Sequence, residues 1–301
     1  MKKLSLVFLF FILSNQIYAQ GKVYKAFKIT ITGKGKPMLF IPGATCSGNE
    51  WDETVERYSK NYECRVFTLA GYAGVPPLSE QPYLDTYKNE IIRYIKSEKL
   101  KDIVLVGHSI GGVLSLSIAA ELKESLQKVV IVDALPFYAL TVNPTAKAGF
   151  DEQLAKKIFA SFSKMDYSQL KASQLAVTRT LCTDSTKWDL IASWGAQSDP
   201  KTMAYSMIEM LGLDLRNTIA TIKVPVLVMA AFTAVPQYPQ YTKEYVLETY
   251  KQQYSQCENC QIHVTPTSRH FIMYDSPVWY FNQLDTFLSA KTSASIAPNG
   301  K

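Results

Sequence analysis

Short apolar runs alternate along the chain with longer segments in which apolar residues recur every three or four positions. The runs are rich in Val, Ile and Leu, as expected for strands that are buried on both faces of a parallel sheet. Segments such as 84–98 instead place their apolar side chains on one face of a helix. The alternation predicts an α/β protein with a mostly parallel twisted sheet flanked by helices. The predicted strands are residues 23–31, an alternating edge strand, then 38–41, 64–69, 103–106, 128–133, 224–230 and 261–264.

A long insertion interrupts this alternation after the strand at 128–133. It holds mostly helical patterns, with helix starts at Asp184 and at Asp199–Pro200, where Asp can cap a helix and Pro fits its first turn. We therefore expect a separate helical unit between two sheet strands. The expected boundaries are 20–134 and 216–290 for the core and 135–215 for the helical insertion.

The two ends of the chain differ in composition from the rest. Residues 1–19 begin with Lys2 and Lys3 and end in a small residue, which predicts a cleaved signal peptide. Their apolar stretch, 4–13, is short of the ~20 residues that a membrane-spanning helix needs. We expect a periplasmic or secreted mature chain with no membrane span. Residues 291–301 are rich in Ser, Ala, Lys and Gly and predict a disordered tail.

The charge balance excludes some partners. The chain has 32 Lys and Arg residues against 26 Asp and Glu residues, and two lysines would leave with the signal peptide. The remaining positive excess is small and dispersed, so we expect no nucleic-acid binding. The three histidines form no cluster with ligand spacing, so we expect no metal site and no cofactor.

Five cysteines in an exported protein allow at most two disulfides. Cys257 and Cys260 are the easiest pair to join. A redox motif of this spacing would lie at a helix N-terminus in a thioredoxin-like context, whereas this pair follows a helical pattern and precedes a strand. A redox or structural protein built around the cysteines is therefore the weaker alternative.

The motif that carries chemistry follows the strand at 103–106. Gly107-His-Ser-Ile-Gly111 has the spacing Gly-x-Ser-x-Gly, and the next residues, 113–122, are apolar and suited to a helix. In a nucleophile elbow the chain turns so sharply between strand and helix that only small residues fit two positions either side of the serine. Ser109 would then project as the nucleophile. The N–H of Ile110 and the start of the helix would favour a developing oxyanion.

With this elbow, the sequence resembles the α/β-hydrolase fold from Val23 to Ala290. The loop that begins at Pro42, where relatives usually carry His, matches the family's oxyanion loop, and by position the resemblance gives the N–H of Ala44 as the second donor. Residues 265–277 match the family's histidine loop and give His270 as the base. The helical insertion corresponds to the family's cap, which would roof the substrate pocket.

The acid of the implied triad departs from the common layout. In most relatives it follows the strand that corresponds to 224–230, but here residues 231–236 contain no Asp or Glu. Asp133 ends the strand beside the elbow strand, a position that some members of the fold use for the acid, and we expect it to orient His270. The alternative is that Asp133 only caps the turn into the insertion. Asp275 is expected to start the last helix instead.

The other two histidines are weaker candidates for the base. His108 directly precedes Ser109 and is expected to point away from the base position. His263 lies inside a predicted strand. His270 is therefore the histidine expected to act.

The resemblance implies an exported serine hydrolase in which Ser109 forms an acyl-enzyme that water releases, without a cofactor. Ester, lactone, thioester and amide substrates stay open, as does acyl transfer to another alcohol. The aromatic and Met side chains of the insertion favour a small-molecule substrate with an apolar portion. The alternative class is a ligand-binding protein with little catalysis, which the missing acid at the usual position favours.

Overall fold

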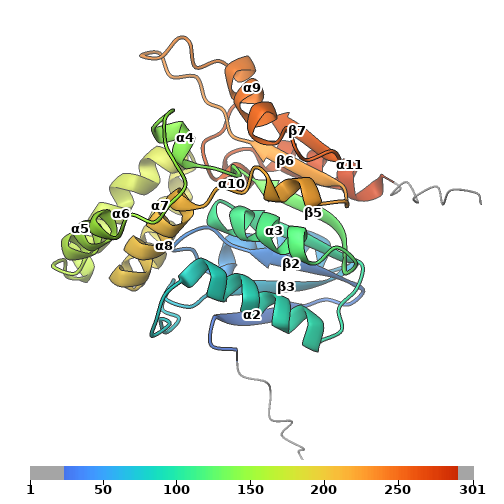
Figure 1. The fold of residues 1–301 in the computed structure, drawn as a ribbon, viewed down its shortest axis with the longest axis horizontal. Coiled ribbons are helices and arrows are strands. Elements are labelled where there is room, and N and C mark those ends of the chain that lie inside the picture. The colour runs from blue at the N-terminus through green and yellow to red at the C-terminus, as the bar shows by residue number, and fades with distance from the viewer. Residues whose placement is uncertain (1–23, 291–301) are drawn as a thin grey trace, which may run out of the picture.

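A seven-stranded sheet lies at the centre of residues 24–290, which the computed structural model describes (Figure 1). Its strand order is β1-β3-β2-β4-β5-β6-β7. β1 pairs antiparallel with β3, and the other neighbours pair in parallel. The prediction of a mostly parallel α/β fold is confirmed. The strands are β1 (Phe27–Thr32), β2 (Lys36–Ile41), β3 (Tyr62–Leu69), β4 (Ile103–His108), β5 (Leu126–Val132), β6 (Val226–Ala230) and β7 (Cys260–Val264).

Helices cover both faces of the sheet, and they divide its side chains into two cores. Along β4, Ile103 and Leu105 belong to the core under α2, α3 and α9, whereas Val104 and Val106 belong to the core under α1 and α11. This split arises because successive side chains of a strand point to opposite faces. The helices of this part are α1 (Asp52–Tyr58), α2 (Tyr83–Ser97), α3 (Ile110–Glu121), α9 (Lys243–Gln253), α10 (Ile272–Asp275) and α11 (Pro277–Ser289), with the 3-10 helices η1 (Gly48–Trp51) and η3 (Thr218–Thr221).

The chain between β5 and β6 forms a helical unit to one side of the sheet (Figure 1). Within it α5 packs against α8 and α6 against α7. The carboxylate of Glu209 on α8 ties this unit to the core, because it accepts the N–H groups of Tyr83 at 3.0 Å and Leu84 at 2.8 Å. Its helices are α4 (Ala139–Val142), α5 (Glu152–Phe162), α6 (Tyr167–Leu181), η2 (Ser185–Lys187), α7 (Trp188–Ala196) and α8 (Pro200–Gly212).

The order of the strands reverses between β2 and β4. Ile41 pairs with Gly107, and in the next pair of strands His108 pairs with Val132. The segments that follow β2, β4 and β5 therefore leave the same edge of the sheet side by side. In open α/β sheets, ligands bind at the carboxyl ends of the strands where the order reverses.

Two local features bear on the sequence. The loop after β2 enters the 3-10 helix η1, whose start is capped because the Ser47 hydroxyl accepts the Asn49 N–H at 3.2 Å. Cys257 and Cys260, the pair easiest to join by sequence, form no disulfide, since all five cysteines are free thiols.

The predicted signal peptide, 1–19, and the predicted tail, 291–301, lie outside the described residues. No helix among residues 24–290 has both the length and the apolarity that crossing a membrane requires.

Candidate active site

Ser109 stands at the tip of a tight turn between β4 and α3. Its backbone has φ 53° and ψ −124°, a conformation that non-glycine residues rarely adopt. The flanking glycines make the turn possible. A Cβ at Gly107 would lie 2.2 Å from the Gly111 carbonyl oxygen, and a Cβ at Gly111 would lie 2.3 Å from the Ile41 carbonyl oxygen. The turn is thus the strand–elbow–helix arrangement that the Gly-x-Ser-x-Gly spacing predicts.

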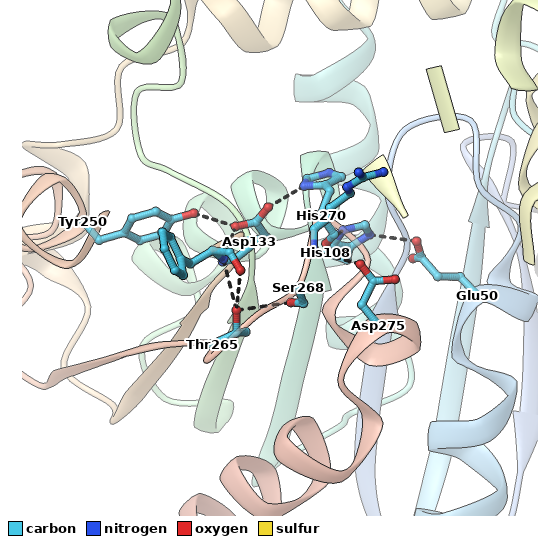
Figure 2. A network of polar contacts seen from close by, with 11 residues as sticks. Glu50, His108, Asp133, Tyr250, Thr265, Ser268, His270 and Asp275 are labelled. Atoms are coloured by element: carbon cyan, nitrogen blue, oxygen red, sulfur yellow. Dashed lines mark hydrogen bonds and ion pairs between the residues drawn. The ribbon is translucent and has the colours of Figure 1, made fainter. Parts of the chain in front are cut away.

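Asp133 follows β5, and its carboxylate pairs with His270, the histidine predicted as the base. Its Oδ2 lies 2.6 Å from Nδ1 of His270 (Figure 2). Its Oδ1 accepts two further hydrogen bonds, from the N–H of Ala231 and from the hydroxyl of Tyr250, both at 2.8 Å. The carboxylate is therefore fixed by three donors from three different segments.

These contacts stabilise the ionised form of Asp133, whose side chain is 14% exposed. Burial alone raises the pKa of the carboxyl. The hydrogen bond and charge of His270, with the donors from Ala231 and Tyr250, outweigh that effect and lower the pKa below its ordinary value. An ionised Asp133 accepts a hydrogen bond from the Nδ1–H of His270, which leaves Nε2 of that ring as an acceptor. This is the tautomer that a general base needs.

His270 lies in the loop between β7 and α10, with its side chain 23% exposed. Asp275, the other carboxylate near this loop, does not pair with it. Its oxygens accept the N–H of Arg269 and that of Thr183, both at 2.8 Å. Asp275 therefore joins the histidine loop to the helical insertion, and the loop is held from both sides.

The two expected oxyanion donors lie on neighbouring loops. Ala44 occupies a turn after β2 that is closed by the bond from the Cys46 N–H to the Gly43 carbonyl at 3.2 Å. Ile110 is the first residue of α3. Among residues 24–290, no acceptor takes the backbone N–H of Ala44 or Ile110. Both N–H groups remain available to a developing oxyanion.

His108 does not point away from the base as expected. Its ring centroid is 4.5 Å from that of His270, and its Nε2 lies 3.1 Å from the His270 carbonyl oxygen. Its Nδ1 lies 2.8 Å from Oε1 of Glu50, a residue that sequence reasoning missed. Tyr250 was missed as well. Neither residue belongs to a recognisable motif.

His263 and the pair Cys257 and Cys260 take no part in this site. His263 bonds through Nδ1 to Gln283 of α11. Cys257 lies in the turn between α9 and β7, and Cys260 is the first residue of β7. Within residues 24–290, no group of three or more His, Cys, Asp or Glu side chains is placed to hold a metal ion.

Known proteins similar to this chain include esterases and a lactonase. A pimeloyl-[acyl-carrier protein] methyl ester esterase of Vibrio atlanticus is 22% identical over 218 residues, covering 65% of this chain and 76% of that protein. A strigolactone esterase of Arabidopsis thaliana is 20% identical over 148 residues, covering 48% of this chain and 55% of that protein. The crystal structure of an enol-lactonase from Burkholderia xenovorans superposes with a TM-score of 0.69 and 15% identity, covering 88% of this chain and 96% of that one.

Residues 38–283 match the profile described as the alpha/beta hydrolase family. The match includes the elbow, Asp133 and the histidine loop, and it covers most of the chain. The expectation of a hydrolase of this superfamily is confirmed. The chain belongs to the α/β-hydrolase family.

Proposed function

We propose that this protein is an exported serine hydrolase that cleaves carboxylic esters through an acyl-enzyme on Ser109. The observation that carries the proposal is the hydrogen bond between Asp133 and His270 at the sheet edge where Ser109 projects. An oriented imidazole at the sheet edge that carries a half-buried elbow serine suits acyl transfer. The similarity to esterases supports ester substrates. The segment 1–19 supports export, which the N-terminal sequence of the mature protein tests.

In the proposed mechanism, His270 takes the proton of Ser109 through Nε2 while the serine oxygen attacks the ester carbonyl. The N–H groups of Ile110 and Ala44 hold the negative oxygen of the tetrahedral intermediate. The imidazolium, stabilised by Asp133, returns the proton to the leaving alkoxide. Water then attacks the acyl-enzyme with the same base, and Ser109 is released with the acid product.

The surroundings of the triad support a small substrate with an apolar portion. Phe232 follows Ala231, whose N–H donates to Asp133, and its ring stacks on Tyr241 with centroids 6.0 Å apart. These rings offer apolar surface near Asp133. Lactones belong to the same proposal, because their ring opening uses the same attack on a carbonyl. The enol-lactonase likeness is one of fold.

The variant Ser109→Ala tests the proposal. We expect it to lose on the order of 10⁴-fold or more of kcat on p-nitrophenyl esters, because the nucleophile acts as a unit with its base. Its melting temperature should be nearly unchanged, since the deleted hydroxyl is not part of the core. Turnover that survives in purified Ser109→Ala protein would remove the proposal. Binding of an ester without turnover by the wild type would instead support the ligand-binding alternative.

A further inference from the structure

A second carboxylate–histidine pair lies buried behind the triad. Glu50 in η1 is 1% exposed and His108 at the end of β4 is 0% exposed. Oε1 of Glu50 lies 2.8 Å from Nδ1 of His108 (Figure 2). Buried carboxylates and imidazoles are costly unless they are paired and hydrogen-bonded. The proposed mechanism gives this pair no role.

The pair contacts all three segments that build the proposed site. The other oxygen of Glu50, Oε2, accepts the N–H of Gly43 at 3.0 Å, one residue before Ala44. His108 directly precedes Ser109 in the elbow. Nε2 of His108 lies 3.1 Å from the main-chain carbonyl oxygen of His270. The oxyanion loop, the nucleophile and the base therefore converge on these two side chains.

Close packing leaves the pair little freedom. A Cβ at Gly43 would lie 2.9 Å from Nδ1 of His108 and 3.4 Å from Oε1 of Glu50. Glycine at this position lets the oxyanion loop approach the pair directly. Tyr274 holds the other side, because its hydroxyl donates to the Glu50 main-chain carbonyl at 3.0 Å.

The contacts determine where the protons of the pair are. A carbonyl oxygen only accepts, so Nε2 of His108 carries a proton that it donates to His270. Glu50 accepts from the Gly43 N–H and faces the buried thiol of Cys46, whose pKa is raised by burial and by the charge and hydrogen bond of Glu50. Oε1 of Glu50 accepts the remaining hydrogen bond of the pair, and Nδ1 of His108 is the donor, so Nδ1 carries a proton as well. His108 is then an imidazolium.

The electrostatics of the pair agree with this assignment. Burial lowers the pKa of His108, but the charge and hydrogen bond of Glu50 outweigh it, and the net pKa is raised. The centroid of this cationic ring is 4.5 Å from that of the His270 ring. A neighbouring positive charge disfavours a second imidazolium. The proposed mechanism uses the neutral form of His270, which takes the proton of Ser109.

The charged groups around His270 come from several elements. Asp133, directly after β5, faces its Nδ1, and Tyr250 of α9 donates to Asp133 from the other side. His108 of β4 lies beside the ring at an interplanar angle of 46°, with Glu50 of η1 beyond it. On the loop itself, Arg269 donates its N–H to Asp275. Of these groups, His108 is the cation whose ring contacts the His270 ring.

We propose that Glu50 and His108 are positioning residues that hold the main chain of His270 and the oxyanion loop in register with Ser109. They also keep a protonated imidazole, that of His108, beside the base His270. The inference rests on the proposed function, because it assigns the pair a role in the action of Ser109 and His270. Neither residue touches the reacting atoms.

Glu50→Gln is the decisive variant. Its amide oxygen can still accept the Gly43 N–H, and its NH₂ can donate to Nδ1 of His108, so the hydrogen bonds remain while the extra proton on His108 is lost. We expect the rising limb of the kcat/KM–pH profile to move to higher pH by on the order of one unit. Nitrogen NMR of histidine-labelled wild-type protein should show His108 doubly protonated at pH 7, and the variant should show it singly protonated.

The matched control is Glu209→Gln, at a half-buried glutamate that also accepts two backbone N–H groups, in the link between α8 and α2. We expect it to change the melting temperature and to leave the pH profile in place. An unmoved profile in Glu50→Gln, or a singly protonated His108 in the wild type at pH 7, would overturn the inference. The NMR measurement of His108 in the wild type tests the inference even if Glu50→Gln fails to fold. Retained activity in Ser109→Ala would instead overturn the proposed function.

Discussion

Among residues 24–290, three of the six non-glycine residues with positive φ lie at the candidate site. Ser109, Asp133 and Thr45 have φ values of 53°, 47° and 64°, in a region that costs non-glycine residues of order 1–3 kcal/mol each. Thr45 adjoins Ala44, so all three lie in loops at the carboxyl ends of neighbouring strands. The paired strands behind these loops hold them in place. We infer that the strain fixes the nucleophile, the acid and an oxyanion donor before substrate binds.

The variant Asp133→Asn tests the role of the acid at this scale. It keeps the size of the side chain but no longer fixes the tautomer of His270. We expect kcat to fall by on the order of 10³ to 10⁴ with the fold retained, by analogy with the same change in other triads. Steady-state kinetics on p-nitrophenyl acetate measures this. If Asp133 only capped the chain, kcat would stay within about tenfold.

The lowered pKa of Asp133 also predicts how this variant behaves with pH. A carboxylate whose folded-state pKa is depressed contributes stability above its unfolded pKa of about 3.9, and the contribution is lost as the pH falls through the folded value. The wild type should therefore exceed Asp133→Asn in melting temperature near neutral pH. Thermal unfolding followed by circular dichroism should show that gap narrowing in acid, and a gap independent of pH would contradict the assignment.

Some of these residues could be named from the sequence and others could not. Ser109 and His270 stand in motifs whose spacing reflects local geometry, a tight turn and a loop before a helix. Glu50 does not stand in such a motif, and a glutamate in a loop or at a helix start is ordinarily exposed. It is buried only because β4 brings His108 beside η1, and that contact joins residues far apart in the chain.

At the scale of elements, helix α9 braces the acid from outside the sheet. Tyr250 donates to Asp133 at 2.8 Å, and four residues later Tyr254 donates to the carbonyl of Ala134 at 2.7 Å. Both hydroxyls point from one face of the helix towards the segment that leaves β5. The sequence does not predict that this helix contacts Asp133, because tyrosines at helical spacing are ordinary core residues.

Tyr250→Phe and Tyr254→Phe form a matched pair of variants on this helix. Each deletes one buried hydroxyl and should lower stability by about 1 kcal/mol. Only Tyr250→Phe removes a donor from Asp133, so we expect kcat to fall about tenfold in that variant and to change little in Tyr254→Phe. Urea unfolding and kinetics on both proteins measure the two effects. Equal kcat values would show that α9 supports only the fold.

The sheet itself was predictable because its strands are buried on both faces and appear as continuous apolar runs. The pairing of β4 with β5 was expected from the chain order, and it suggested Asp133 once the loop after β6 was seen to lack an acid. The exact positions of the short helices were not predictable. η1, for example, begins at a cap from Ser47 that only the folded loop reveals.

At the scale of the molecule, the candidate site is assembled from residues between 44 and 270 of the chain. The reversal of strand order between β2 and β4 brings the oxyanion loop beside the elbow, and the parallel strands β5 and β7 bring in the acid and the base. The helical unit reaches the histidine loop through Asp275. The oxyanion loop, the nucleophile, the acid and the base each follow a different strand. The sheet therefore brings them together although these four segments are separated in the sequence.

The claim that Ser109 is an activated nucleophile is tested most directly by a fluorophosphonate probe. Intact mass and peptide mapping of the labelled wild type should show one adduct per chain, on the peptide that contains Ser109, because only an activated hydroxyl reacts. Ser109→Ala should remain unlabelled, and His270→Ala should label far more slowly. Folded wild-type protein that takes up no probe, or that carries it on a serine other than Ser109, would contradict the account.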